Sequence, residues 1–218
     1  HPKKRAGGFM KKQTANQITE GVIWKQLLLF FFPILFGTFF QQLYNTADAV
    51  IVGNFVGKEA LAAVGGPAAT LINLLVGFFV GLSSGATVII SQFYGAKNNA
   101  DVKKAVHTSI ALSLAGGAII MILGLIFSGA ALQLMNTPDD IMKLSLTYMR
   151  IYFLGVIPSL IYNMGSGILR AAGDAKRPLY FLIISCFINI ILDIFFVVVL
   201  KLGVAGVAIA TTLSQVAS

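Results

Sequence analysis

Charged side chains are scarce in this sequence: they make up 11% of its 218 residues, against about 25% in an ordinary soluble domain. Because 57% of the residues are hydrophobic and the mean hydropathy is +0.85, a soluble globular domain is excluded, as are disordered and collagen-like chains. A single cysteine, Cys186, excludes an intrachain disulfide framework. The alternation typical of barrel strands is missing, whereas apolar runs exceed about 18 residues, so the sequence predicts membrane-spanning helices.

What the chain does contain is a series of long apolar stretches between short polar turns. The stretches lie at about 24–56, 60–94, 104–132, 141–168, 178–200 and 204–218. We therefore predict an all-α integral membrane protein, a six-helix transmembrane bundle over residues 24–218 preceded by a basic cytoplasmic tail over residues 1–23. The last stretch is shorter than the ~20 residues that a bilayer requires, so we expect that its helix is truncated. Pro33 lacks a backbone N–H and predicts a bend in the first helix.

Basic residues gather on one side of the predicted bundle. With the N-terminus in the cytoplasm, the inner side carries the basic residues of the tail and the first helix together with Lys97, Lys103, Lys104, Arg170, Lys176 and Arg177, against Lys58, Lys143 and Lys201 on the outer side. This bias predicts a multi-pass protein of the plasma membrane with a cytoplasmic N-terminus. The same distribution accounts for the formal net charge of +8, so we expect membrane lipids around the protein and no nucleic-acid partner.

Acidic residues number only eight, and two of them, Asp48 and Asp193, lie inside apolar stretches. Each costs up to about 2.5–3.5 kcal/mol at the middle of a membrane helix. Both have polar residues at three- or four-residue spacing on the same helical face, namely Thr38, Gln41 and Asn45 before Asp48, and Ser185 and Asn189 before Asp193. Two isolated aspartates with such polar neighbours indicate a site within the membrane.

The expected depths bring these residues together. At 1.5 Å per residue, Asp48 and Asp193 lie roughly 15 and 12 Å from the outer ends of two outward-running helices, and the hydroxyl of Thr211 reaches a similar level on the inward-running sixth helix. We therefore expect convergence in the outer half of the bundle of Asp48, Asn189, Asp193 and Thr211, with Gln41 and Asn45 as supporting polar residues.

Such a cluster can take up positive charge. Carboxylates, an amide oxygen and a hydroxyl are hard ligands that suit a small cation. Two carboxylates in a medium of low dielectric constant also repel each other, which favours uptake of a proton by one of them. Na⁺ and H⁺ both remain open as the coupling ion of a carrier, and we expect no other cofactor. Two simpler interpretations stay open as well: a carboxylate that reaches the outer surface, and an ordinary interhelical hydrogen bond.

Four segments carry a resemblance to a known family. They are NTADAVIVG at 45–53, SQFYGA at 91–96, GILRAAGDAKRP at 167–178 and NIILD at 189–193. In this order and spacing they resemble the N-terminal half of the multidrug and toxic compound extrusion (MATE) transporters, from about residue 20 to the end of the sequence.

The resemblance implies twelve helices in two six-helix lobes, of which this chain is similar to the N-lobe. It implies a Na⁺- or H⁺-coupled antiporter that exports organic, often cationic, compounds by alternating access, with a C-terminal lobe in the same chain or in a second subunit. It also implies a cation site at Asp48, Asn189, Asp193 and Thr211, a supporting polar role for Asn163, and a bend at Pro33.

Other functions fit the residues less well. An intramembrane aspartyl protease has its second aspartate after Gly-x-Gly, whereas Asp193 follows three aliphatic residues. Because the sequence also has no phosphate-binding loop or zinc-binding His pair, we do not expect an enzyme. A flippase for lipid-linked oligosaccharides, from the same wider superfamily, and a six-helix half-transporter that dimerises remain as alternatives.

Overall fold

The computed structural model describes residues 23–218, and this part of the chain is helical, without strands. The elements are α1 (Ile23–Phe55), α2 (Lys58–Gly65), α3 (Pro67–Gly95), α4 (Asn99–Leu134), α5 (Asp139–Leu154), α6 (Val156–Ala171), α7 (Lys176–Asp193), the π-helix η1 (Ile194–Val199) and α8 (Gly203–Ala217). The fold is an all-α bundle, as predicted. The predicted tail, apart from Ile23, lies outside the described residues.

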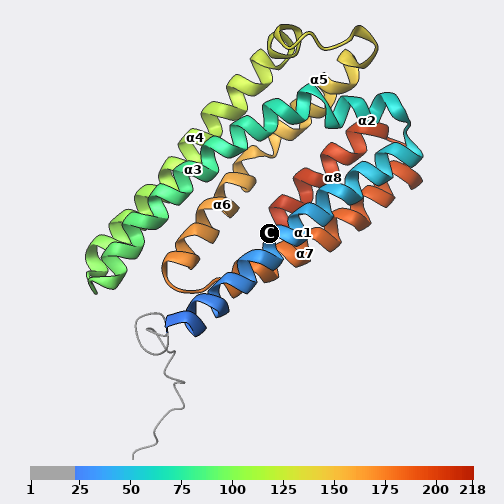
Figure 1. Cartoon of the computed structure of the whole chain (residues 1–218). Helices are drawn as coiled ribbons and strands as arrows, with labels where there is room; N and C mark the ends of the chain where they lie inside the picture. The colour runs from blue at the N-terminus through green and yellow to red at the C-terminus, as the bar shows by residue number, and fades with distance from the viewer. Residues whose placement is uncertain (1–22) are drawn as a thin grey trace, which may run out of the picture.

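The helices pack as one bundle with two groups of neighbours. At the left of Figure 1, α3 and α4 run side by side and both contact α6. At the right, α7 contacts both α1 and α8, and α2 and α5 contact each other near the top. Long apolar side chains cover the outside of the bundle, for example Leu74 (71% exposed) and Phe78 (68% exposed). An outer surface of this kind is expected where lipid replaces water.

Four stretches are long and apolar enough to cross a membrane: α1, α2 with α3, α4, and α7 with η1. The bent pair of α5 and α6 makes a fifth if it is counted as one span, and α8 is a shorter apolar helix of 15 residues. All connections between the predicted stretches fall at the expected polar turns. Several of these turns contain a residue with positive φ, such as Gly57 and Gly173, where glycine is favoured because it has no Cβ.

Two breaks inside the predicted stretches were not expected. The stretch 60–94 is divided between α2 and α3 at Gly66, which precedes Pro67. Proline disfavours helical geometry in the preceding residue, and a Cβ at Gly66 would lie only 2.5 Å from the carbonyl oxygen of Ala62. The stretch 141–168 bends by 53° between α5 and α6, at Gly155. Pro158 lacks the N–H that would bond to the carbonyl of Leu154, which explains why the bend falls there.

Pro33 does not interrupt the first helix. Helix α1 is continuous from Ile23 to Phe55, with Pro33 inside it. A proline at the end of its third turn removes one backbone hydrogen bond without ending the helix, because the rest of α1 packs along α7. The bend of 53° between two helices lies in the α5–α6 pair, and a bend within the continuous α1 stays a prediction.

Candidate cation site

The structure brings together the four predicted side chains from three helices. Asp48 comes from α1, Asn189 and Asp193 from α7, and Thr211 from α8. Asn189 and Asp193 are fully buried, and Asp48 and Thr211 are nearly so. The Oγ1 of Thr211 lies 3.5 Å from Oδ2 of Asp48 and donates a hydrogen bond of 2.9 Å to the carbonyl oxygen of Val207. The Asp48 carboxyl group also lies within interaction range of Asn189 and Asp193.

Most polar atoms of this cluster have no hydrogen-bond partner. They are Oδ1 of Asp48, both carboxylate oxygens of Asp193, and both side-chain polar atoms of Asn189. A buried polar atom without a partner costs about 1–3 kcal/mol, and a charged one costs more. Two facing carboxylates without protons cannot bond to each other, so a proton or a cation is needed to compensate their charge. The arrangement therefore fits a bound cation.

The ligand set favours a particular kind of ion. Among residues 23–218, no three His, Cys, Asp or Glu side chains form a group that could hold a metal ion. The cluster instead offers two carboxylates, one amide oxygen and one hydroxyl. Oxygen ligands with a total charge of −2 suit a small hard cation better than a soft transition metal. The site can also compensate its charge by taking up a proton on one carboxylate.

A cavity of about 490 Å³ opens beside the cluster. Asp48 and Thr211 lie on its wall, and Asp48 is the only charged side chain among the described residues that line it. Three further predicted residues, Gln41, Asn45 and Asn163, line the same cavity. Thr38, which was predicted on the face of Asp48, is exposed outside it and donates a hydrogen bond to the carbonyl oxygen of Ile34.

Asn163 differs from the other supporting residues because its polar groups already have partners. Its Nδ2 donates a hydrogen bond of 2.8 Å to the backbone carbonyl oxygen of Ser159, and its backbone carbonyl oxygen accepts one of 2.9 Å from Ser83 Oγ. The first bond lies within α6, and the second ties α3 to α6 at the cavity wall. The residue thus faces the cavity without joining the cluster around Asp48.

Sequence reasoning missed the tyrosines of this cavity. Tyr44 lies one helical turn before Asp48, is buried, and has a hydroxyl without a hydrogen-bond partner beside Thr211 and Ser214. Tyr148 and Tyr152 come from α5, with ring centroids 6.3 Å apart, and Tyr148 lies within electrostatic range of both aspartates. The four-residue spacing of Tyr44 and Asp48 was a signal in the sequence. The approach of α5 was not, because it depends on tertiary packing.

A short chain of hydroxyl groups holds α7 against α8 next to the cluster. Ser185 Oγ donates a hydrogen bond of 2.7 Å to the carbonyl oxygen of Ser214, and Ser214 Oγ donates one of 2.8 Å to the carbonyl oxygen of Thr211. Ser185 and Ser214 are buried. Fully satisfied polar groups in a low dielectric fix geometry firmly, so these bonds set the position of Thr211 relative to α7.

Comparison with known families identifies the family of this chain. The model of the family described as MatE matches residues 33–195, which include most of α1, all of α7 and three of the four clustered side chains. The chain belongs to the MatE family. The members of this family are integral membrane transporters.

Relatives within the MatE family are about twice as long. The chain is 34% identical over 200 residues to the probable multidrug resistance protein YoeA of Bacillus subtilis, a match that covers 90% of this chain and 43% of YoeA. It is 33% identical over 205 residues to the probable multidrug resistance protein YpnP of the same organism, covering 92% of this chain and 45% of YpnP. The chain thus spans less than half the length of these relatives.

Solved transporter structures are also about twice as long as this chain. A MOP superfamily transporter from Pyrococcus furiosus superposes with a TM-score of 0.86 at 31% identity, covering 94% of this chain and 45% of that chain. The bundle described here corresponds to one half of such a transporter, which fits the predicted N-lobe.

Proposed function

We propose that the protein is the N-lobe of a cation-coupled antiporter that exports organic, often cationic, compounds. The observation that carries the proposal is the set of unpartnered oxygens on Asp48, Asn189 and Asp193, buried beside a cavity whose one charged wall residue is Asp48. Buried acids in a membrane bundle mark ion or substrate pathways. The names of the multidrug resistance relatives support export of drugs or toxic compounds.

Coupling follows from competition for one negative charge. When Na⁺ or H⁺ occupies the cluster, it neutralises the carboxylates and weakens the attraction of the cavity for a cationic substrate. When the ion leaves, the charge of Asp48 is again available to the substrate. A carrier that opens to one side at a time can therefore exchange the two, as alternating access requires.

The complete carrier needs a second lobe. We propose that the second lobe faces the side of the cavity near Gln41 and Asn45, which are exposed along α1. It belongs either to a longer form of the same polypeptide or to a second subunit. In the plasma membrane, we place the N-terminus and the α3–α4 turn on the cytoplasmic side, in line with the distribution of lysine and arginine.

Dye efflux tests this proposal. Ethidium is added outside inverted membrane vesicles from cells that express the protein together with its second lobe, and uptake of the dye is measured under an imposed Na⁺ or pH gradient. We expect gradient-driven transport that Asp48→Asn abolishes, because the neutral amide cannot exchange a cation. Glu59→Gln, an exposed acid at the start of α2, is the matched control and should leave transport unchanged. Transport by Asp48→Asn at the wild-type rate would refute the role of Asp48.

The alternative as a lipid-linked oligosaccharide flippase predicts a different cavity. An anionic pyrophosphate headgroup requires basic side chains, and no Lys or Arg is among the described residues that line the cavity. The charge of the wall supports cationic cargo over anionic cargo. If ethidium is not transported, a fluorescent lipid-linked sugar in the same vesicles tests the flippase.

A further inference from the structure

A second cavity lies on the opposite side of α3 from the cation site. It has a volume of about 650 Å³ and is open along one side, between α3 and α4. Its wall is formed mainly by small and aliphatic residues from α3, including Gly81, Gly85 and Ile89, and from α4, including Leu112. It shares no residue with the cavity beside Asp48. The volume falls in the range of about 300–1,000 Å³ that is typical of small-molecule sites.

The glycines of this groove do not serve close helix packing. A Cβ at Gly81 or Gly85 would meet no atom within 4 Å. Glycines that do serve packing in this bundle look different: a Cβ at Gly124 would overlap the ring of Phe153, and one at Gly167 would overlap Thr87. Gly81 and Gly85 therefore leave an open channel on the surface of α3 that larger side chains would fill.

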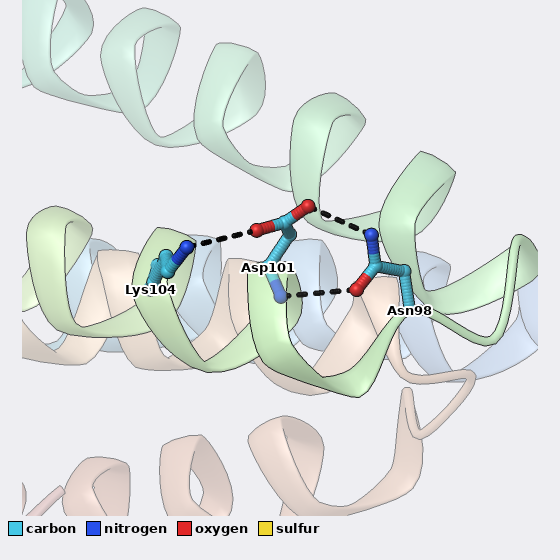
Figure 2. Close-up of polar contacts among 3 residues, drawn as sticks. All are labelled: Asn98, Asp101 and Lys104. Carbon is cyan, nitrogen blue, oxygen red and sulfur yellow. Dashed lines mark hydrogen bonds and ion pairs between the residues drawn. The ribbon is translucent and has the colours of Figure 1, made fainter.

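The groove ends at a basic rim by the turn between α3 and α4. Figure 2 shows Lys104 beside Asp101, with Nζ 3.4 Å from Oδ1 and the lysine side chain 79% exposed. The other oxygen of Asp101 accepts a shorter hydrogen bond of 2.7 Å from Nδ2 of Asn98, which also caps α4. Asp101 is thus held mainly by Asn98, and its long contact with Lys104 leaves the exposed ammonium group able to contact a second anion as well. Lys97 and Lys103 add positive charge to the same turn.

The groove has the depth of one lipid leaflet. From Lys104 to Leu112, eight residues of α4 span about 12 Å at 1.5 Å per residue. Half of a hydrocarbon core of ~30 Å is ~15 Å. An apolar wall of this depth beneath a basic rim matches an acyl chain below a phosphate headgroup. Basic pockets between membrane helices at the cytoplasmic side are known to bind anionic headgroups.

We propose that the groove between α3 and α4 is a binding site for one anionic phospholipid. An acyl chain lies along Gly81 and Gly85, and the headgroup phosphate contacts the ammonium group of Lys104. The charge complementarity of the rim selects an anionic headgroup over a zwitterionic one. Under the orientation proposed above, the lipid lies in the cytoplasmic leaflet. Binding of the lipid does not depend on whether the protein transports a substrate.

Native mass spectrometry of the protein in detergent, titrated with dioleoylphosphatidylglycerol or dioleoylphosphatidylcholine, measures this binding. We expect tighter binding of phosphatidylglycerol. Lys104→Gln should weaken that binding about fivefold, which is typical for one basic residue near an anionic headgroup. It should weaken binding of phosphatidylcholine less, because the choline cation offsets the charge of the phosphate. Gly85→Leu, which fills open space without a clash, should weaken binding of both lipids. Asp101→Asn should strengthen binding of phosphatidylglycerol, because it frees Lys104.

Two variants serve as matched controls. Lys143→Gln removes an exposed lysine on α5, and Gly165→Leu adds the same side chain at another glycine with nothing within 4 Å. Both should bind lipid like the wild type. Unchanged binding of phosphatidylglycerol by Lys104→Gln or by Gly85→Leu overturns the site, and equal binding of the two lipids by the wild type overturns its charge selectivity. If a second copy of the chain or a second lobe occupied the groove instead of a lipid, substitutions in the groove would leave lipid binding at the wild-type level, and the proposed lipid site would be wrong.

Discussion

Asp193 is a buried carboxylate whose negative charge is not compensated by any hydrogen bond among the described residues. It is fully buried, and neither of its oxygens has a hydrogen-bond partner. Its carboxylate faces Asp48 at the end of α7, where the backbone changes from an α-helix to the π-helix η1. Short π-helices often accompany functional sites in proteins. A buried charge in this setting is destabilising by itself and becomes favourable only with a bound cation or proton.

Because a bound cation would compensate the charge of Asp193 and Asp48, we expect Na⁺ to stabilise the wild-type protein. At a concentration of one hundred times the dissociation constant, the gain is about 2.7 kcal/mol, or roughly 5–10 °C in melting temperature for a protein of this size. Asp193→Asn should melt higher than the wild type without Na⁺, because the repulsion between the carboxylates is removed, and should gain nothing from Na⁺. The measurement is the temperature at which half of the protein leaves the monodisperse peak in size-exclusion chromatography.

Asp139→Asn, at an exposed acid in the first turn of α5, is the control and should keep the full response to Na⁺. Choline chloride at equal ionic strength separates a specific ion from a salt effect. A wild type that responds equally to Na⁺ and choline would leave the proton as the coupling ion and would remove Na⁺ from the proposal.

The same oxygens predict how stabilisation by Na⁺ depends on pH. Protons and Na⁺ compete for the carboxylates of Asp48 and Asp193, so the melting shift caused by Na⁺ should shrink as the pH falls and grow as it rises. Melting curves at several pH values, each with and without Na⁺, measure this effect. A Na⁺ shift that is independent of pH would mean that the ion binds without displacing a proton.

At the scale of elements, close approaches at glycine hold the helices together. A Cβ at Gly155 would lie 2.5 Å from Cγ2 of Thr212, so the bend between α5 and α6 lies directly against α8. The Oγ1 of Thr212 also lies 3.4 Å from the carbonyl oxygen of Ile151 and donates to it. Helices that associate in lipid rely on such packing, because no hydrophobic driving force acts between them.

Gly124 provides a test of this packing. Gly124→Ala should destabilise the bundle by about 1–3 kcal/mol, the usual cost of overpacking, because its Cβ would overlap the buried ring of Phe153. Gly77→Ala is the matched control: it meets no atom within 4 Å and should be neutral or slightly stabilising, because alanine favours helix. The comparison uses the same thermal assay. Equal melting temperatures for the two variants would contradict close packing of α4 on α5.

At the scale of the whole molecule, the orientation of the bundle in the membrane can be tested at exposed lysines near its two ends. Lys97 lies in the turn between α3 and α4, and Lys143 lies on α5 near the opposite end of the bundle. The native Cys186 is buried at 1% exposure, so it should not react, and single cysteines can be introduced on the natural background. Their reactivity toward a membrane-impermeant maleimide then distinguishes the two sides of the membrane.

For the orientation proposed here, Lys143→Cys should react with the maleimide on intact cells. Lys97→Cys should react only after the cells are permeabilised, because the turn between α3 and α4 faces the cytoplasm. The wild type serves as the control for labelling of Cys186. The reverse pattern would invert the bundle in the membrane and place the predicted basic tail outside.

The sequence by itself determined the class and most of the plan of this protein. Apolar length and polar turns fixed the helices, since a membrane segment must satisfy its backbone bonds internally. The cost of burying a charge in lipid singled out Asp48 and Asp193, and helical spacing added Asn189. These are local properties of the chain, which can be read without knowing how the helices pack.

Only the tertiary structure decided what surrounds those residues. The bend at Gly155, the approach of Tyr148 from α5 and the groove between α3 and α4 depend on contacts between distant segments. The unbroken course of α1 through Pro33 depends in the same way on α7. Packing between helices arises from the shapes of many side chains at once, and a one-dimensional pattern of polarity does not contain those shapes.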